Sequence, residues 1–126
     1  MRTQDYSETV VRRFLAPSHA GPPPDGGRVL TGRASAPGDL DLALYLSLAP
    51  DDVTIVGATF LARACPAGIA AADWACEWLR GRTLEEARGL TVAHIEAGAG
   101  LAPDRRDRGL LVEDALAAAL ARARDA

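Results

Sequence analysis

The sequence predicts an α+β fold with an N-terminal helix, a three-stranded antiparallel sheet, and a C-terminal set of helices packed on one face of that sheet. Strand-like segments occupy only the first half of the chain and are separated by short turn signals, which favours an antiparallel meander. The second half shows helical periodicity and helix-capping signals. The length of 126 residues is typical of one domain, so we expect residues 1–126 to form a single domain.

The first expected element is a short amphipathic helix at residues 6–15. Its valines and phenylalanine fall on one helical face, whereas Arg12 and Arg13 are expected to face solvent. Pro17 ends this helix. The Gly/Pro-rich stretch at 18–27 is expected to form an exposed loop.

Three strands are expected next, at residues 28–35, 40–46 and 53–61. The second alternates well between apolar and polar residues, and the third is rich in β-branched residues. Turn signals at 38–39 and 50–52 separate them.

Helices are expected over the rest of the chain. A long helix at 66–80 is followed by a short one at 83–89, which opens with a capping-box pattern, and by another at 91–97. Residues 98–107 are expected to form a loop. The final helix is expected at 110–124, with arginines near its negative end.

Composition excludes several classes of function. The formal net charge is −3, from 14 basic and 17 acidic residues, so neither nucleic acid nor an anionic membrane is an expected partner. No run of about 18 apolar residues predicts a membrane span. The polar N-terminal residues 1–5 do not resemble a signal peptide. Cys65 and Cys76 lack disulfide or zinc-motif spacing, so a cytoplasmic location is expected.

Seven short stretches, in unbroken order along nearly the whole chain, carry a family resemblance. They are Tyr6-Ser7-Glu8, residues 17–21, residues 36–39, residues 60–65, residues 77–87, residues 101–105 and Glu113-Asp114-Ala115. Together they resemble the IscU/NifU N-terminal family of iron–sulfur cluster assembly scaffolds. The resemblance implies one NifU N-terminal-like domain at 1–126, with the α+β architecture that SufE-type proteins share.

The resemblance also implies a site, which is incomplete here. The family holds its cluster with three cysteines and a nearby aspartate, and a histidine precedes the third cysteine. This chain keeps Asp39 and Cys65 at the matching positions, whereas the first cysteine position is Pro37 and the third is Arg108. Asp107 stands at the position of the histidine.

One thiolate and one carboxylate fall short of the ligand set of an iron–sulfur cluster or of a divalent metal. A cluster within one chain is therefore not expected, but a cluster shared between two chains or completed by a small thiol stays an alternative. Another alternative is an ion pair between Asp39 and Arg108 in place of a metal.

Cys65 is the candidate reactive thiol. If Pro66 opens the helix, Cys65 is its N-cap, where the helix dipole favours a thiolate. By the family geometry, Arg108 would lie nearby and act in the same direction. The alternative is an inert, buried cysteine. Cys76 falls on an apolar helix face and is expected to be a core residue.

Leu101, Pro103 and Arg105 lie where the family has its chaperone-docking motif, and they are the candidate partner-binding residues. The expected partners are a cysteine desulfurase or another iron–sulfur assembly protein, and a DnaK-type chaperone. The chain has no phosphate-binding loop, nucleophile elbow or zinc-protease motif, so we do not expect an enzyme.

The leading functional hypothesis is a scaffold-like protein of iron–sulfur cluster assembly that handles iron or sulfur through Cys65. Two alternatives remain open. One is a SufE-like relay that carries persulfide sulfur, and the other is a non-catalytic interaction module that has lost cluster binding.

Overall fold

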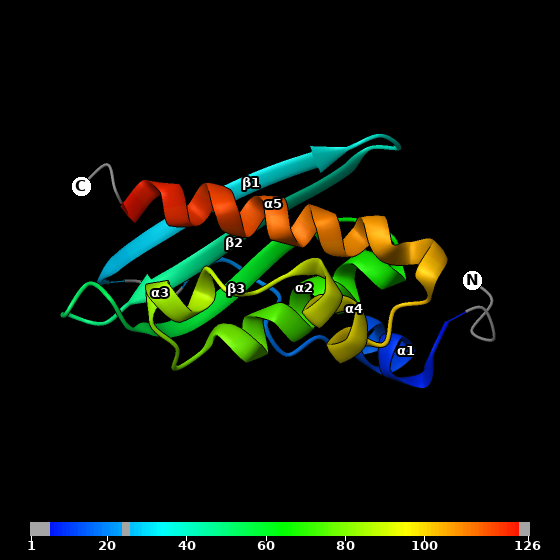
Figure 1. The fold of residues 1–126 in the computed structure, drawn as a ribbon, viewed down its shortest axis with the longest axis horizontal. Helices are drawn as coiled ribbons and strands as arrows, with labels where there is room; N and C mark the ends of the chain where they lie inside the picture. The colour runs from blue at the N-terminus through cyan, green and yellow to red at the C-terminus, as the bar shows by residue number, and fades with distance from the viewer. Residues whose placement is uncertain (1–5, 24–25, 124–126) are drawn as a thin grey trace.

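The computed structural model describes residues 6–23 and 26–123 and has the predicted order of helices and strands. The elements are α1 (Glu8–Leu15), β1 (Arg28–Ala36), β2 (Leu40–Leu48), β3 (Ile55–Arg63), α2 (Pro66–Leu79), α3 (Leu84–Ala87), α4 (Val92–Ala99), the 3₁₀ helix η2 (Pro103–Arg105) and α5 (Arg106–Arg122). Figure 1 shows the helices gathered on one face of the sheet, with α5 lying along the strands. The predicted α+β class is confirmed.

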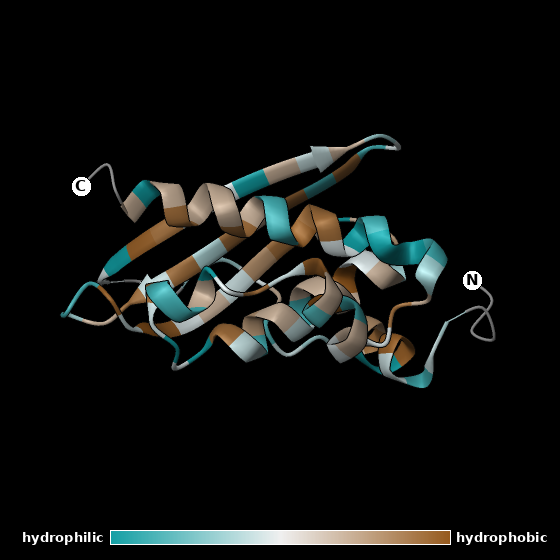
Figure 2. Cartoon of the chain, viewed as in Figure 1, coloured by the Kyte–Doolittle hydropathy of each residue, from teal (hydrophilic) through white to brown (hydrophobic). Residues whose placement is uncertain are grey.

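The sheet has the order β1-β2-β3, and both strand pairs are antiparallel. Leucines at every second position of β2 are buried on the face that the helices cover, at positions 42, 44, 46 and 48. Figure 2 shows the apolar segments in the strands and in the helices above them. A backbone pairing between Ala20 and Phe60 adds a short parallel bridge at the free edge of β3. This bridge covers part of an edge that would otherwise expose unpaired backbone groups.

The third strand begins two residues later than predicted, because Val53 lies in the preceding bend and Thr54 forms an isolated antiparallel bridge with Thr83. The Asp51 carboxylate accepts hydrogen bonds from the backbone N–H groups of both residues, each at 2.9 Å. Such side-chain to backbone bonds hold a turn and compete with the sheet ladder.

The predicted loop at 98–107 is wrong over most of its length. Helix α4 continues to Ala99, η2 covers Pro103–Arg105, and α5 begins at Arg106, four residues before the predicted start. The charged run there had favoured a solvated loop, yet arginine is a good helix former. Residue 124, at the predicted end of the last helix, lies outside the described residues.

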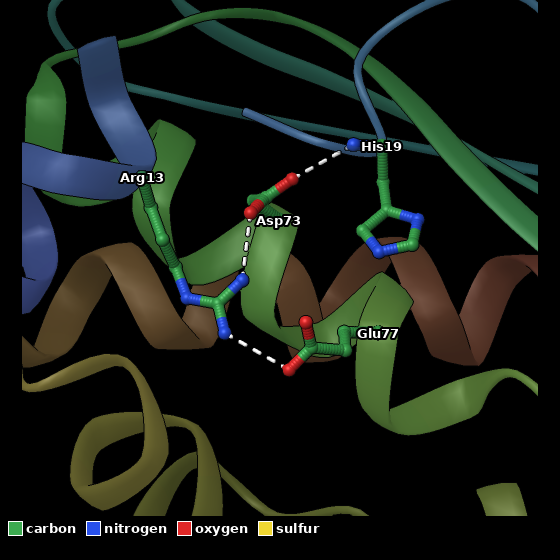
Figure 3. Close-up of polar contacts among 4 residues, drawn as sticks. All are labelled: Arg13, His19, Asp73 and Glu77. Atoms are coloured by element: carbon green, nitrogen blue, oxygen red, sulfur yellow. Dashed lines mark hydrogen bonds and ion pairs between the residues drawn. The ribbon is translucent and has the colours of Figure 1, made fainter. Parts of the chain in front are cut away.

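Arg13 does not face solvent as predicted. Its guanidinium donates through Nη1 to Oδ2 of Asp73 at 2.7 Å and through Nη2 to Oε2 of Glu77 at 3.0 Å. Asp73 lies in α2 with only 1% of its side chain exposed, and its Oδ1 accepts the backbone N–H of His19 at 2.9 Å. Figure 3 shows these contacts, which join α1, α2 and the segment around His19.

Within residues 6–23 and 26–123, no helix is both long enough and apolar enough to cross a membrane.

Candidate functional site

Three segments that are distant in the sequence lie toward one end of the molecule. They are the turn between β1 and β2, the loop that precedes α2, and the first turn of α5 (Figure 1). These segments carry Pro37 and Asp39, Cys65, and Asp107 and Arg108, respectively.

Cys65 is the N-cap of α2, as predicted. Its backbone is extended, with φ −72° and ψ 170°, and Pro66 is the first helical residue. The residue is half-buried. The thiol therefore stands at the positive end of a fourteen-residue helix.

Arg108 reaches Cys65 from the first turn of α5. Its Nε–H donates to Cys65 Sγ at 3.1 Å, and its Nη1 pairs with the Asp107 carboxylate. The neighbouring Gly109 is buried, and a Cβ there would lie 3.0 Å from Cγ2 of Val92. The small residue thus allows the start of α5 to pack close to α4.

These contacts favour the ionised form of the thiol. Burial of Cys65 opposes ionisation, but the hydrogen bond from Arg108, the N–H groups of Gly68 and Ala67 and the arginine charge outweigh it. The pKa of Cys65 therefore lies below its ordinary value. The hydrogen bond to Cys65 in turn raises the pKa of Arg108.

Cys76 is the opposite case. It is fully buried in the core, as predicted, and burial raises its pKa far above the ordinary value. Its thiol is therefore inert at neutral pH.

Pro37 and Asp39 sit in the exposed turn at the tip of the β1–β2 hairpin. Asp39 has a φ of 59°, in the left-handed region that aspartate tolerates better than most residues. Within the described residues its carboxylate makes no ion pair with Arg108, which instead contacts Cys65 and Asp107. The hypothesis of an Asp39–Arg108 ion pair is thus not borne out by these contacts.

The side chains at this end do not complete a metal site. In the part of the chain that the structure describes, no group of three or more His, Cys, Asp or Glu residues is placed to hold a metal ion. Pro37 has no ligating atom, and Arg108 brings a positive charge against the one thiol. An iron–sulfur cluster or a zinc ion would need several sulfur or nitrogen ligands here, so the residues present do not fit either group.

The candidate partner residues divide into buried and accessible ones. Leu101 is 7% exposed and belongs to the core, so a partner could not reach its side chain without a rearrangement. Pro103 is exposed, and the Arg105 guanidinium lies over the Tyr6 ring at 5.2 Å from its centroid. Of these three residues, Pro103 and Arg105 are therefore the ones that a partner could reach.

The family model of the NifU-like N-terminal domain matches residues 5–125. The chain belongs to the NifU-like N-terminal domain family. The fold and the family that the sequence motifs indicated are both confirmed.

Named relatives of this NifU-like domain are assembly proteins. The scaffold protein IscU of Azotobacter vinelandii is 32% identical over 119 residues, which cover 91% of both chains. A Drosophila melanogaster protein named iron–sulfur cluster assembly enzyme IscU is 32% identical over 92% of this chain and 76% of its own length.

The fold also matches the crystal structure of a candidate cluster assembly scaffold of the SUF system from Fervidobacterium islandicum AW-1. The TM-score is 0.72 and the identity is 19%, over 95% of this chain and 99% of that one. At this identity the match shows the fold alone.

Proposed function

We propose that this chain acts in iron–sulfur cluster assembly as a scaffold-like protein that handles sulfur or iron through a single thiol, Cys65. One observation carries the proposal: within a scaffold-family fold, the Cys65 thiol lies at a helix N-terminus and 3.1 Å from Arg108 Nε. A cysteine so placed is a thiolate at lower pH than a free one, and the thiolate is the form that accepts sulfur or binds metal.

The same contact favours a second function, a SufE-like relay of persulfide sulfur. In that step, the Cys65 thiolate attacks the outer sulfur of a persulfide on a donor protein. The new bond joins Sγ to that sulfur, the donor's S–S bond breaks, and the donor cysteine leaves as a thiolate. No further oxidant is needed, and Arg108 would balance the negative charge on the product.

The expected partner is a cysteine desulfurase or another assembly protein, and Pro103 and Arg105 offer the accessible surface for it or for a DnaK-type chaperone. In this role the chain receives and passes on cargo and is not an enzyme with its own turnover. The free thiols of Cys65 and Cys76 support a reducing, cytoplasmic location. A core shared by helices and strands supports a single domain over residues 1–126.

The test is anaerobic incubation with ferrous iron, cysteine and a cysteine desulfurase. Visible absorbance reports a cluster, and intact mass reports added sulfur in the same sample. Cys65→Ser is compared with Cys76→Ala, which keeps a small apolar side chain in the core and leaves Cys65 in place. Absorbance that requires Cys65 supports the scaffold, and added sulfur without absorbance supports the relay.

If neither signal depends on Cys65, handling of sulfur and iron is refuted. The remaining account would then be an interaction module that keeps the fold without the chemistry.

A further inference from the structure

The end of the molecule that carries Cys65 is arranged around one negative charge. The Cys65 Sγ accepts a hydrogen bond from the Nε–H of Arg108. The backbone N–H groups of Gly68 and Ala67 also favour the anionic form of the sulfur. Helix α2 begins at this residue, with Cys65 as its N-cap. The positive end of α2 and one guanidinium therefore meet a single thiol.

These groups would repel a metal ion bound at Cys65, because the ion and the groups are both positively charged or polarised. The Arg108 Nε–H lies 3.1 Å from Sγ and occupies one side of the sulfur. A divalent cation at Sγ would also lie close to the guanidinium charge, which cannot be neutralised by deprotonation. The Asp107 carboxylate also pairs with this guanidinium.

The β1–β2 turn does not complete a metal site. Pro37 contributes no ligand, and Asp39 lies in the exposed hairpin turn. Over residues 6–23 and 26–123, the metal-binding side chains form no group of three. The available ligands and the local positive charge therefore do not suit the iron–sulfur cluster that the family implies.

We propose that the Arg108 guanidinium is the built-in counter-ion of the Cys65 thiolate and takes the place of a metal ion, so that the isolated chain holds an anionic sulfur without zinc or iron. This inference rests on the proposed function, because it states which cargo the site can hold. It favours sulfur over a cluster retained within one chain.

The test measures Co²⁺ and Zn²⁺ binding to the reduced, isolated chain under anaerobic conditions. Wild type should show no thiolate-to-cobalt charge-transfer absorption. Pro37→Cys combined with Arg108→Cys removes the guanidinium and supplies two thiols beside Cys65 and Asp39. This variant should bind about one metal ion per chain with tetrahedral Co²⁺ bands.

The matched control is Pro37→Cys combined with Arg106→Cys. It adds the same number of thiols, but Arg106 is an exposed residue that faces Glu96, with 3.9 Å between the charged groups. This control should not bind. If the first double variant does not fold, Arg108→Cys alone must bind Co²⁺ more tightly than Arg106→Cys.

Two results overturn the proposal. One is metal binding by wild type that Cys65→Ser abolishes, and the other is an Arg108→Cys series that binds no better than its Arg106 control. Neither result bears on whether a desulfurase recognises the chain, because no partner protein is present. Failure of the proposed function is instead seen in the desulfurase experiment, so the two failures can be told apart.

Discussion

Cys65 and Cys76 carry the same side chain in opposite surroundings, and the surroundings determine their chemistry. Cys76 is enclosed by the core, whereas Cys65 faces a guanidinium and a helix N-terminus. The sequence predicted this division, because Pro66 marks a helix start and Cys76 lies on an apolar helical face. It did not predict that Tyr6, which is distant in the sequence, lies against Arg105 in the segment before α5.

At the residue scale, the reactivity of Cys65 should depend on Arg108. The pKa of Cys65 is lowered in the folded chain, so alkylation by iodoacetamide should rise with pH around a midpoint below that of an ordinary thiol. Arg108→Leu removes the hydrogen bond and the charge but keeps the burial, so the midpoint should move upward. Arg106→Leu, an exposed change on the same turn, should leave it unchanged. The same midpoint in Arg108→Leu and wild type would contradict the assignment.

The same ionisation affects stability. Because the pKa of the folded thiol is lower than that of the unfolded one, ionised Cys65 stabilises the folded chain above the unfolded pKa. This contribution is lost as the pH falls through the folded pKa. The free energy of unfolding of Arg108→Leu should therefore be lower than that of wild type, and this difference should be smaller at neutral pH than at alkaline pH.

The Arg13–Asp73 pair gives a second prediction at the residue scale. Arg13→Leu leaves the Asp73 carboxylate buried with only the His19 N–H as a partner. Loss of one member of a buried ion pair costs about 3–5 kcal/mol. The free energy of unfolding in urea should fall by about 3 kcal/mol, the low end, because Arg13 retains some exposure.

Glu77→Ala is the matched control for Arg13→Leu. It removes the other partner of the same guanidinium, but the Glu77 side chain is 59% exposed. Its cost should stay below about 1 kcal/mol, as for surface pairs. Equal losses in the free energy of unfolding for the two variants would show that the buried Arg13–Asp73 contact stabilises the fold no more than the exposed Arg13–Glu77 contact.

At the scale of whole elements, the sheet was more predictable than the start of the last helix. Alternation and turn signals placed each strand within two residues, because the β2 leucines must all reach one core. The start of α5 was missed because its first turn, Arg106 to Gly109, has no apolar stripe and no side-chain cap. That turn is helical through packing of Gly109 on Val92, a contact between distant parts of the sequence.

Gly32 sets how closely α5 approaches the sheet. A Cβ at this position would overlap the backbone carbonyl of Ala115 and lie 2.9 Å from the Ala119 Cβ, so Gly32→Ala must push α5 away from β1. Such overpacking costs about 1–3 kcal/mol. Thermal unfolding should show the loss.

Gly57→Ala provides the comparison within the same sheet. The nearest atom to a Cβ at Gly57 is the Ser47 Cβ at 3.8 Å, an ordinary contact. Because alanine restricts the unfolded chain, this variant should be neutral or gain up to about 1 kcal/mol. If Gly57→Ala lost as much stability as Gly32→Ala, the close approach of α5 to the sheet could not be the cause of the destabilisation by Gly32→Ala.

At the scale of the whole molecule, the extent of the core determines whether the stability of the fold depends on a bound metal ion. The buried residues of the sheet, α1, α2 and α5 form a continuous apolar cluster, and the site lies beside it at one end. Stability then comes from the core, and the site is free to lose its ligands without loss of the fold. This separation is consistent with a family fold that keeps its core while Pro37 and Arg108 stand where the resemblance places cysteines.

The melting temperature of wild type should therefore be the same with a chelator and with excess Zn²⁺. A ligand that binds only the folded state at 100 times its Kd adds about 2.7 kcal/mol. For a domain of this size, which falls between the ranges for smaller and larger domains at about 4 °C per kcal/mol, that would raise the melting temperature by about 11 °C. The Pro37→Cys/Arg108→Cys variant should show such a rise with Zn²⁺, whereas Pro37→Cys/Arg106→Cys should not. A zinc-dependent rise in wild type that Cys65→Ser removes would mean that the thiol holds a metal after all, with Arg108 displaced from its place beside the sulfur.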